Sequence, residues 1–373
     1  MPNITGNHVD VVIIGGGMAG VSLAARLAPL VSVRLLERET QLGYHSTSRS
    51  AAMFIPNYGT PLLRKLILAS EDDLKGDAVV EGGVLSPRGE LAMVSADESD
   101  ALDAYLDGSV GLSLITPAEA RELCPILSKD KFVSAVYDAK AADIDVDRLF
   151  QGFIRLAKSH GADITTNTEV KAINRKGEHW QVVTNQGDIE AKIIVNASGA
   201  WASVIGDMAS ASPITITPCR RSAAMVPLPD DVSPDLWPMI ASISETWYAK
   251  PDAGRLMVSP ADQDPIAPCD AWADDLILAE GIDRFEQATT IKVTRLEHQW
   301  AGLRSFADDH DPVVGFDPIA PGFFWLAGQG GNGIQTAPAL SLIAKELILG
   351  ETGPQTHADL ETLAQLSPAR FVS

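Results

Sequence analysis

The sequence predicts an α/β fold that opens with a βαβ unit and continues into a second domain built on a mixed, mostly antiparallel sheet. Three observations support this prediction. Within residues 9–30, an apolar, β-branched run leads into three glycines spaced G-x-G-x-x-G and then into a helix-like stretch. A second apolar run, 31–36, ends in an acid. From about residue 213 onward, strand-like segments alternate with proline-rich turns.

The glycine-rich turn has the spacing of a dinucleotide-binding loop. Gly15 permits the tight turn, Gly17 lets phosphates approach the backbone, and Gly20 lets helix and strand pack closely. Glu37, 22 residues after Gly15, stands where an acid accepts hydrogen bonds from an adenosine ribose. Because strand, glycines, helix, strand and acid follow in order, we expect a Rossmann-like domain that binds a dinucleotide.

Composition and charge restrict the class of protein. The chain has 373 residues, 46% of them hydrophobic, which is enough for two domains with hydrophobic cores. Its formal net charge of −20 disfavours nucleic acid and anionic membranes as partners. Three cysteines without a C-x-x-C pair indicate a reducing compartment. With no signal peptide and no apolar run of about 20 residues, we expect a cytoplasmic protein, at most peripheral at the inner membrane.

A long polar segment follows Glu37. Residues 41–61 contain a cluster of hydroxyl groups and one cation: Ser46, Thr47, Ser48, Arg49 and Ser50. A helical turn over 46–53 would point donors at phosphates or at a ring edge, although a solvated serine-rich loop fits this composition as well. A segment of this length directly after the ribose acid suits an elongated cofactor such as FAD better than NAD.

The middle of the chain contains one clear helix and several strands. Apolar residues recur at helical spacing over 147–160. Strands are expected within 81–94, where Glu90 stands, and over 164–195. The last strand runs into small residues that include Gly199, which favours either a close approach to a cofactor or tight strand–helix packing.

Two arginines stand in apolar surroundings in the later part of the chain. Arg221 precedes a strand-like run, and Arg304 lies within the apolar segment 300–306. A buried arginine usually binds a carboxylate, which belongs either to a structural acid or to a ligand, and spacing alone leaves both open. The sequence also leaves two roles open for Tyr248: its side chain packs in the core, or its hydroxyl group points at a ligand.

A second glycine-rich junction between a strand and a helix lies near the C-terminus. The apolar run at 323–327 leads into several glycines and then into a helix-like stretch. A helix N-terminus here would stabilise negative charge on a reduced flavin. The sequence contains no H-E-x-x-H, Cys/His or G-x-S-x-G motif, so we expect neither a catalytic metal nor a serine nucleophile. No cysteine or histidine is assignable to a covalent flavin bond, so we expect noncovalent FAD.

Together these segments resemble the FAD-dependent D-amino-acid oxidase-type (DAO) superfamily. Within it, the chain is most similar to bacterial D-arginine dehydrogenases. The resemblance is carried by the glycine motif with Glu37 and Arg38, by 43–52 (GYHSTSRSAA), 300–304 (WAGLR) and 329–336 (QGGNGIQT), and by agreement at 85–90, 220–223 and 250–254.

The resemblance implies a fold and a reaction. A discontinuous FAD-binding domain of the glutathione-reductase type would take residues 1–80, 140–212 and 300–373, and a substrate domain would take 81–139 and 213–299. The reaction would be oxidative deamination of a D-amino acid. A hydride would pass from Cα to flavin N5, and the imino acid would hydrolyse to a 2-oxo acid and ammonia. Electrons would then pass to a quinone or another acceptor.

The resemblance also implies roles for individual residues. Arg221 and Arg304 would clamp the substrate carboxylate, assisted by hydroxyl groups from Tyr58 and Tyr248. The carbonyl of Gly331 would accept a hydrogen bond from the substrate amine. Residues expected to line FAD are Gly15, Gly17, Ala19, Gly20, Glu37, Arg38, Ser46, Thr47, Ser48, Arg49, Ser50, Ala51, Ala52, Met53, Val170, Gly199, Gly331, Asn332, Gly333, Ile334, Gln335 and Thr336.

The substrate pocket expected from the resemblance has mixed polarity. Glu90 would bind a guanidinium or ammonium group at the far end of the substrate side chain. Met53, Ile55 and Asn332 stand where D-arginine dehydrogenases have histidine, threonine and tyrosine. With Met239, they make the pocket less polar, so we expect both basic and hydrophobic D-amino acids as substrates. The alternatives are a glycine or N-methyl-amino-acid oxidase of the same fold and a flavin-carrying subunit of a larger dehydrogenase.

Overall fold

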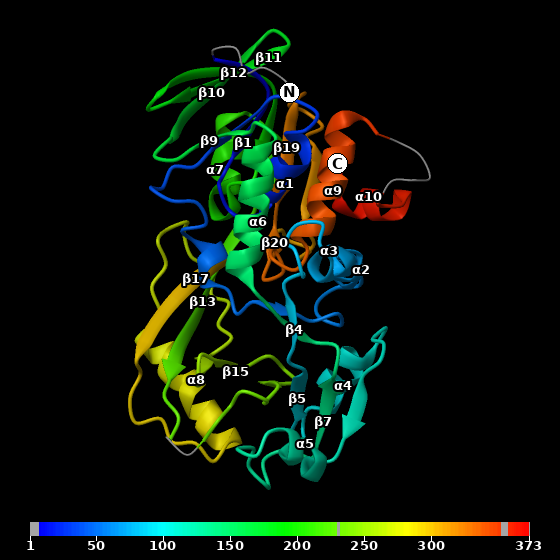
Figure 1. Ribbon diagram of the computed structural model, residues 1–373, viewed down its shortest axis with the longest axis vertical. Coiled ribbons are helices and arrows are strands. Elements are labelled where there is room, and N and C mark those ends of the chain that lie inside the picture. Colours follow the sequence, from blue (N-terminus) through cyan, green and yellow to red (C-terminus); the bar gives the residue numbers. More distant parts are fainter. Residues whose placement is uncertain (1–6, 230–231, 352–356, 373) are drawn as a thin grey trace.

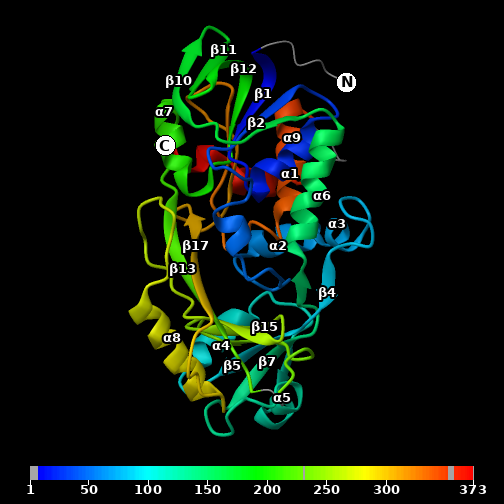
Figure 2. The ribbon, with the colours of Figure 1, turned by 60° about the vertical axis from the view of Figure 1, so that its left-hand side comes forward.

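The strands form three sheets in a computed structural model that describes residues 7–229, 232–351 and 357–372. The first sheet and its helices occupy the upper half of Figure 1, and most of the second sheet lies in the lower half. Two long strands, β13 (Thr217–Val226) and β17 (His298–Phe306), run from the middle of the molecule into the lower half. Figure 2 shows the same arrangement from another side.

The first sheet has a parallel centre, as the βαβ pattern predicts. Its main path runs in the order β10-β11-β12-β1-β2-β9, with β19 paired to the end of β12 and β18 paired to β19. The strands are β1 (His8–Ile14), β2 (Val33–Leu36), β9 (Asp163–Thr165), β10 (Val170–Lys176), β11 (His179–Thr184), β12 (Gly187–Asn196), β18 (Val313–Phe316) and β19 (Phe323–Ala327).

Both faces of this sheet are covered, which explains why residues 11–14 of β1 are all apolar instead of alternating. Val11 and Ile13 pack into the core beneath helices α1, α6 and α9. Val12 and Ile14 pack into a second core on the side of α7. No described helix has the length and apolarity needed to cross a membrane. The helices of this half are α1 (Met18–Leu27), α2 (Pro61–Ala69), α3 (Glu71–Lys75), α6 (Val146–Ser159), α7 (Ala202–Met208), α9 (Ala337–Leu349) and α10 (Leu360–Leu366).

The second sheet is mixed, because β14 and β5 are parallel while its other neighbouring strands are antiparallel. Its order is β20-β17-β13-β16-β15-β14-β5-β7-β6. Besides β13 and β17, its strands are β5 (Glu90–Val94), β6 (Ser113–Ile115), β7 (Ser134–Asp138), β14 (Met239–Ser242), β15 (Tyr248–Asp252), β16 (Arg255–Ser259) and β20 (Gln329–Gly330); its helices are α4 (Ser99–Leu106), α5 (Pro117–Leu123) and α8 (Asp275–Ala288).

A small third sheet links the two halves. It consists of β3 (Met53–Phe54), β8 (Ala142–Ile144) and β4 (Leu85–Pro87), with β8 in the centre. In both views β4 lies between the two halves. The predicted fold class is therefore confirmed, since a Rossmann-like sheet and a mixed second sheet are both present. The domain boundaries stay a prediction; β17, which spans the boundary expected at residue 300, pairs within the second sheet, and residues 1–6, 352–356 and 373 lie outside the described chain.

Candidate active site

Two adjoining pockets lie where the two halves meet. The first, with about 1680 Å³ of empty space including open solvent, runs from the β1–α1 turn past the end of β2 to β17. The second, with about 800 Å³, lies beyond it among β3, β5, β14 and β15. The pockets share the lining residues Ser50, Ala51, Arg221, Tyr248, Arg304, Gly331 and Ile334. A long ligand in the first pocket would therefore reach the second.

The glycine turn brings three backbone segments into close approach. Gly15 has φ +112°, and a Cβ there would lie 2.3 Å from the carbonyl oxygen of Ala197. A Cβ on Gly20 would lie 2.0 Å from the carbonyl oxygen of Gly15. Larger residues at either position would push β1, α1 and the end of β12 apart. The N–H of Met18 donates to Thr47 Oγ1 at 3.0 Å, which ties the turn to the polar segment after β2.

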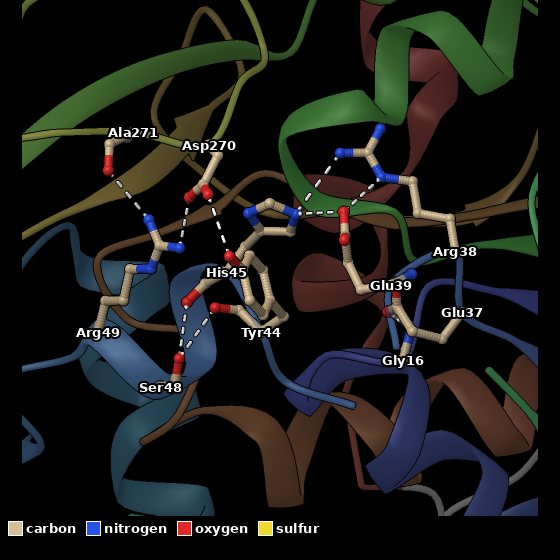
Figure 3. Close-up of polar contacts among 10 residues, drawn as sticks. All are labelled: Gly16, Glu37, Arg38, Glu39, Tyr44, His45, Ser48, Arg49, Asp270 and Ala271. Carbon is tan, nitrogen blue, oxygen red and sulfur yellow. Dashed lines mark hydrogen bonds and ion pairs between the residues drawn. The ribbon is translucent and has the colours of Figure 1, made fainter. Parts of the chain in front are cut away.

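The acid at the end of β2 is held by backbone donors (Figure 3). Glu37 Oε2 accepts from the N–H of Gly16 at 2.8 Å, and Oε1 accepts from the N–H of Glu39 at 2.9 Å. Each oxygen has further acceptor capacity, and Glu37 lines the first pocket. The carboxylate is thus oriented before any ligand binds. A ribose is the ligand that this position in a βαβ unit accommodates.

A cluster absent from the sequence predictions forms the wall next to Glu37. The guanidinium of Arg38 lies 3.8 Å from the ring centroid of Trp201, and its Nε lies 3.0 Å from Glu39 Oε1. His45 Nε2 lies 2.9 Å from the same oxygen. Burial raises the pKa of Glu39, but the hydrogen bonds from His45 and Arg38 outweigh it and leave this pKa below its usual value. The spacing of Glu39, His45 and Trp201 in the sequence does not indicate that these residues lie close together.

The polar segment forms a 3-10 turn, η1 (Ser46–Arg49), within the range where a helical turn was predicted. Ser46 Oγ donates to the carbonyl of Leu303 at 2.6 Å, and Arg49 pairs with Asp270 at 2.5 Å. The segment therefore connects the first sheet to β17 and to the loop before α8, as Figure 3 shows for Arg49. Ser48 lines neither pocket; its Oγ donates to the carbonyl of Tyr44 at 3.0 Å.

Most of the residues predicted to bind FAD line the first pocket. Ala52, Met53 and Gln335 line the second. Three of the others, Gly20, Asn332 and Thr336, line neither pocket and shape the backbone nearby; for example, Thr336 Oγ1 donates to the carbonyl of Asn332 at 2.8 Å. Those in the first pocket are Gly15, Gly17, Ala19, Glu37, Arg38, Ser46, Thr47, Arg49, Ser50, Ala51, Val170, Gly199, Gly331, Gly333 and Ile334.

The second pocket brings together all nine residues predicted to contact the substrate: Met53, Ile55, Tyr58, Glu90, Arg221, Met239, Tyr248, Arg304 and Gly331. They come from β3 and the segment after it, β5, β13, β14, β15, β17 and the loop before α9. Met53, Ile55, Met239 and Tyr248 belong to one hydrophobic cluster. The pocket is therefore apolar along its length, with polar groups at its ends.

The two arginines lie at the end of the second pocket that adjoins the first. Arg221 Nε donates to the carbonyl of Asp262 at 2.7 Å, and Nη2 donates to Gln263 Oε1 at 3.3 Å. Burial, together with the charge of Arg304, lowers the pKa of Arg221. A Cβ on Gly331 would lie 2.7 Å from Arg304 Nη1, so that loop rests on the guanidinium. Within the described residues, neither arginine forms a salt bridge.

Tyr58 has an acidic partner that the sequence analysis missed. Its hydroxyl group donates to Glu245 Oε2 at 2.9 Å, and burial followed by the charge of Glu245 raises the pKa of Tyr58 to about 12. Glu245 lies in the β14–β15 turn with φ +51° and lines the second pocket. A turn was predictable between these strands, but not which of its side chains points inward.

The far end of the pocket is acidic. Glu90 is 5% exposed, and its Oε2 accepts a hydrogen bond from the Tyr105 hydroxyl at 3.1 Å. Burial raises the pKa of Glu90 to about 8, and the charges of Asp138 and Glu245 add to this increase. Tyr105 lies on α4 and was not predicted as a site residue. The pocket thus has two arginines where it adjoins the first pocket and the buried acid Glu90 away from it.

Comparison with known proteins agrees with this geometry. The sequence pattern of the DAO family, FAD-dependent oxidoreductases, matches residues 10–347. The chain is 25% identical over 370 residues to the glycine oxidase of Geobacillus kaustophilus (strain HTA426), covering 92% of this chain and 93% of that enzyme. The crystal structure of glycine oxidase from Geobacillus kaustophilus superposes with a TM-score of 0.82 at 24% identity, covering 99% and 100% of the two chains.

A second solved structure has the same fold. L-proline dehydrogenase from P. horikoshii superposes with a TM-score of 0.81 at 22% identity and covers 98% of both chains. The glycine turn, the oriented ribose acid and the long first pocket fit FAD, and the family match covers most of the chain. The chain therefore belongs to the DAO family of FAD-dependent oxidoreductases.

Proposed function

We propose that the protein is a D-amino acid dehydrogenase that accepts basic and hydrophobic D-amino acids and holds FAD noncovalently. The observation that carries this proposal is the polarity of the second pocket. Two arginines without salt bridges lie where this pocket adjoins the first one, an apolar wall follows, and the buried acid Glu90 lies away from the first pocket. Glu245 is linked to the arginine end through the Tyr58 hydroxyl. An amino acid carboxylate suits the first end, and a long side chain suits the remainder.

The protein groups would bind and orient the substrate. Arg221 and Arg304 would hold its carboxylate, with Arg221 already fixed by the carbonyl of Asp262. The buried hydroxyl of Tyr248 would add a hydrogen bond, and the carbonyl of Gly331 would accept one from the amine. Bound FAD supplies the two-electron acceptor that takes a hydride from Cα. The amine must be neutral when the hydride leaves, because its lone pair forms the C=N bond of the imino acid.

Glycine oxidation is the second candidate, and the glycine oxidase relative favours it. Glycine and N-methyl-amino acids have no group that reaches Glu90, so a pocket for them has no need of a distal acid. The buried acid Glu90 therefore favours a substrate with a longer side chain. We also place the protein in the cytoplasm, at most peripheral at a membrane, on the basis of its charge of −20 and its unpaired cysteines.

Anaerobic mixing tests the proposal. The purified holoenzyme is mixed without oxygen with D-arginine, D-lysine, D-leucine or D-methionine, with their L-enantiomers, and with glycine and sarcosine. The flavin absorbance should bleach with the D-amino acids. Full absorbance after all four would reject the proposal. Rapid bleaching by glycine or sarcosine that is unchanged in Glu90→Ala would instead support the second candidate.

A further inference from the structure

Glu90 faces a second buried carboxylate. In the antiparallel pairing of β5 and β7, Glu90 lies directly opposite Asp138. Glu90 is 5% exposed and Asp138 is 2% exposed. Within the described residues, neither acid forms a salt bridge. Two carboxylates at opposed positions in an apolar interior repel each other, and ionising both is costly.

The hydrogen bonds of the two acids differ, and the difference decides which one keeps the charge. Asp138 accepts from Asn57 Nδ2 at 2.9 Å and from the backbone N–H of Lys140 at 2.9 Å. Asn57 is itself fixed, since its Oδ1 accepts from the N–H of Val110 at 2.9 Å. Glu90 accepts from one neutral hydroxyl group, that of Tyr105. Of two opposed carboxyl groups, the one with fewer donors is the costlier to ionise, and that group is Glu90.

On this geometry, and resting on the proposed function, we propose that Glu90 holds a proton in the substrate-free enzyme at neutral pH. Asp138 is the positioning residue that keeps the proton on Glu90. A cationic substrate side chain displaces this proton when it binds. A neutral side chain leaves the proton in place. Binding a cation then releases one proton to solvent, and the net charge of the site stays constant. One pocket thereby accepts both classes of side chain, which explains why an acid lies at the end of an apolar wall.

The groups around Glu90 are consistent with this assignment. Tyr105 faces it from α4, Asp138 from β7, and Glu245 from the β14–β15 turn. From β14, its neighbour in register is Met239, which does not titrate. Burial and the two acids hold the pKa of Glu90 at about 8, against the opposing hydrogen bond from Tyr105.

The test compares D-arginine with D-citrulline, its neutral isostere, by kcat/KM between pH 6 and pH 9. Titration of the substrate amine and of the rest of the enzyme affects both substrates, so it cancels in the ratio of D-arginine to D-citrulline. We expect this ratio to rise about tenfold per pH unit below pH 8 and then to level off. In Glu90→Gln the ratio should be independent of pH.

Two further variants should shift the pH at which the ratio levels off, here called the break, in opposite directions. Asp138→Asn removes the opposed charge, so Glu90 ionises more easily and the break shifts to lower pH. Tyr105→Phe removes the hydrogen bond that favours ionised Glu90, so the break shifts to higher pH. A purely structural role for either residue predicts no such opposite shifts. Tyr105→Phe and the wild-type profile still decide the matter if Asp138→Asn does not fold.

Different experimental results would overturn the proton on Glu90 and the proposed oxidation of D-amino acids. A pH-independent ratio in the wild-type enzyme, with both compounds reducing the flavin, overturns the proton on Glu90 and leaves D-amino acid oxidation standing. If D-arginine, D-citrulline and D-leucine all fail to reduce the flavin at every pH, both this inference and the proposed function are overturned. A break that moves to lower pH in Tyr105→Phe also contradicts the assignment.

Discussion

Arg220 and Arg221 are neighbours on β13, yet their guanidinium groups have different partners. Arg220 lies within salt-bridge distance of Asp262, Asp264 and Asp274. Arg221, on the opposite face of the strand, lines the second pocket, where we propose that the substrate binds, and has neutral acceptors. A single strand therefore separates a structural arginine from one that is available to a ligand. Residue pattern alone does not separate these roles; the family resemblance assigned the clamp to Arg221.

Replacing Arg221 with methionine should reduce activity more than stability. The variant loses a buried, charge-assisted pairing with the substrate carboxylate worth about 2–5 kcal/mol, or roughly 30- to 5,000-fold in kcat/KM. Steady-state kinetics with D-leucine measure this loss. The matched control is Arg220→Met, which should lower the melting temperature through its lost acidic partners while KM stays near the wild-type value. Equal losses of activity in the two variants would contradict the assignment of the clamp.

At the scale of elements, the small third sheet carries an ion cluster that supports the substrate pocket. Asp143, in the central strand β8, pairs in register with Met53 of β3. Its Oδ1 lies 3.0 Å from Lys250 Nζ, and its Oδ2 lies 2.6 Å from an Arg88 guanidinium nitrogen. Lys250 is two residues from Tyr248 on β15, and Arg88 is two residues before Glu90. The carboxylate thus ties the segments of Lys250 and Arg88 to β8, and the backbone of β8 pairs with β3.

Asp143→Asn should loosen this support. The substitution leaves two partly buried cations without their shared partner, which costs about 1–3 kcal/mol. We expect a lower melting temperature and a higher KM for D-amino acids. Adding Lys250→Met removes one of the two cations that have lost their partner. The double variant should therefore recover part of the lost melting temperature and part of the increase in KM. The surface pair of Asp359 with Lys65 is the control: Asp359→Asn keeps the N-cap of α10 and should change neither quantity measurably.

The elements that local pattern predicts are those whose periodicity is strong. The β1–α1 unit was predictable because a strand buried on both faces is an unbroken apolar run ahead of the glycines. Helix α6 was predictable because its buried stripe recurs at helical spacing. The partners of Glu90 were not predictable, since Tyr105 and Asp138 reach it only when α4, β5 and β7 pack together. The motif residues of the pocket were identified through family resemblance; Glu245 lies in a turn that the quoted motifs do not include.

At the scale of the whole molecule, the first pocket, where we propose that FAD binds, is built from both halves. Gly15 and Glu37 come from the first sheet, whereas Leu303 and Arg304 come from β17 of the second. The polar segment after β2 crosses between them, with Ser46 bonded to the carbonyl of Leu303. A ligand in this cleft contacts both halves at once, so its binding energy opposes their separation.

Removal of FAD should therefore lower the melting temperature of the whole chain. A ligand that binds only the folded state stabilises it by about 2.7 kcal/mol when its free concentration is 100 times its Kd. Calorimetry of the apoprotein with increasing FAD measures the increment. Glu37→Ala removes the carboxylate that faces the ribose position, so a fixed concentration of FAD should raise its melting temperature less than that of the wild type. If saturating FAD left the wild-type melting temperature unchanged, the cleft between the halves would not be where the cofactor binds, and the adjoining pocket would lose its assignment as the site of oxidation.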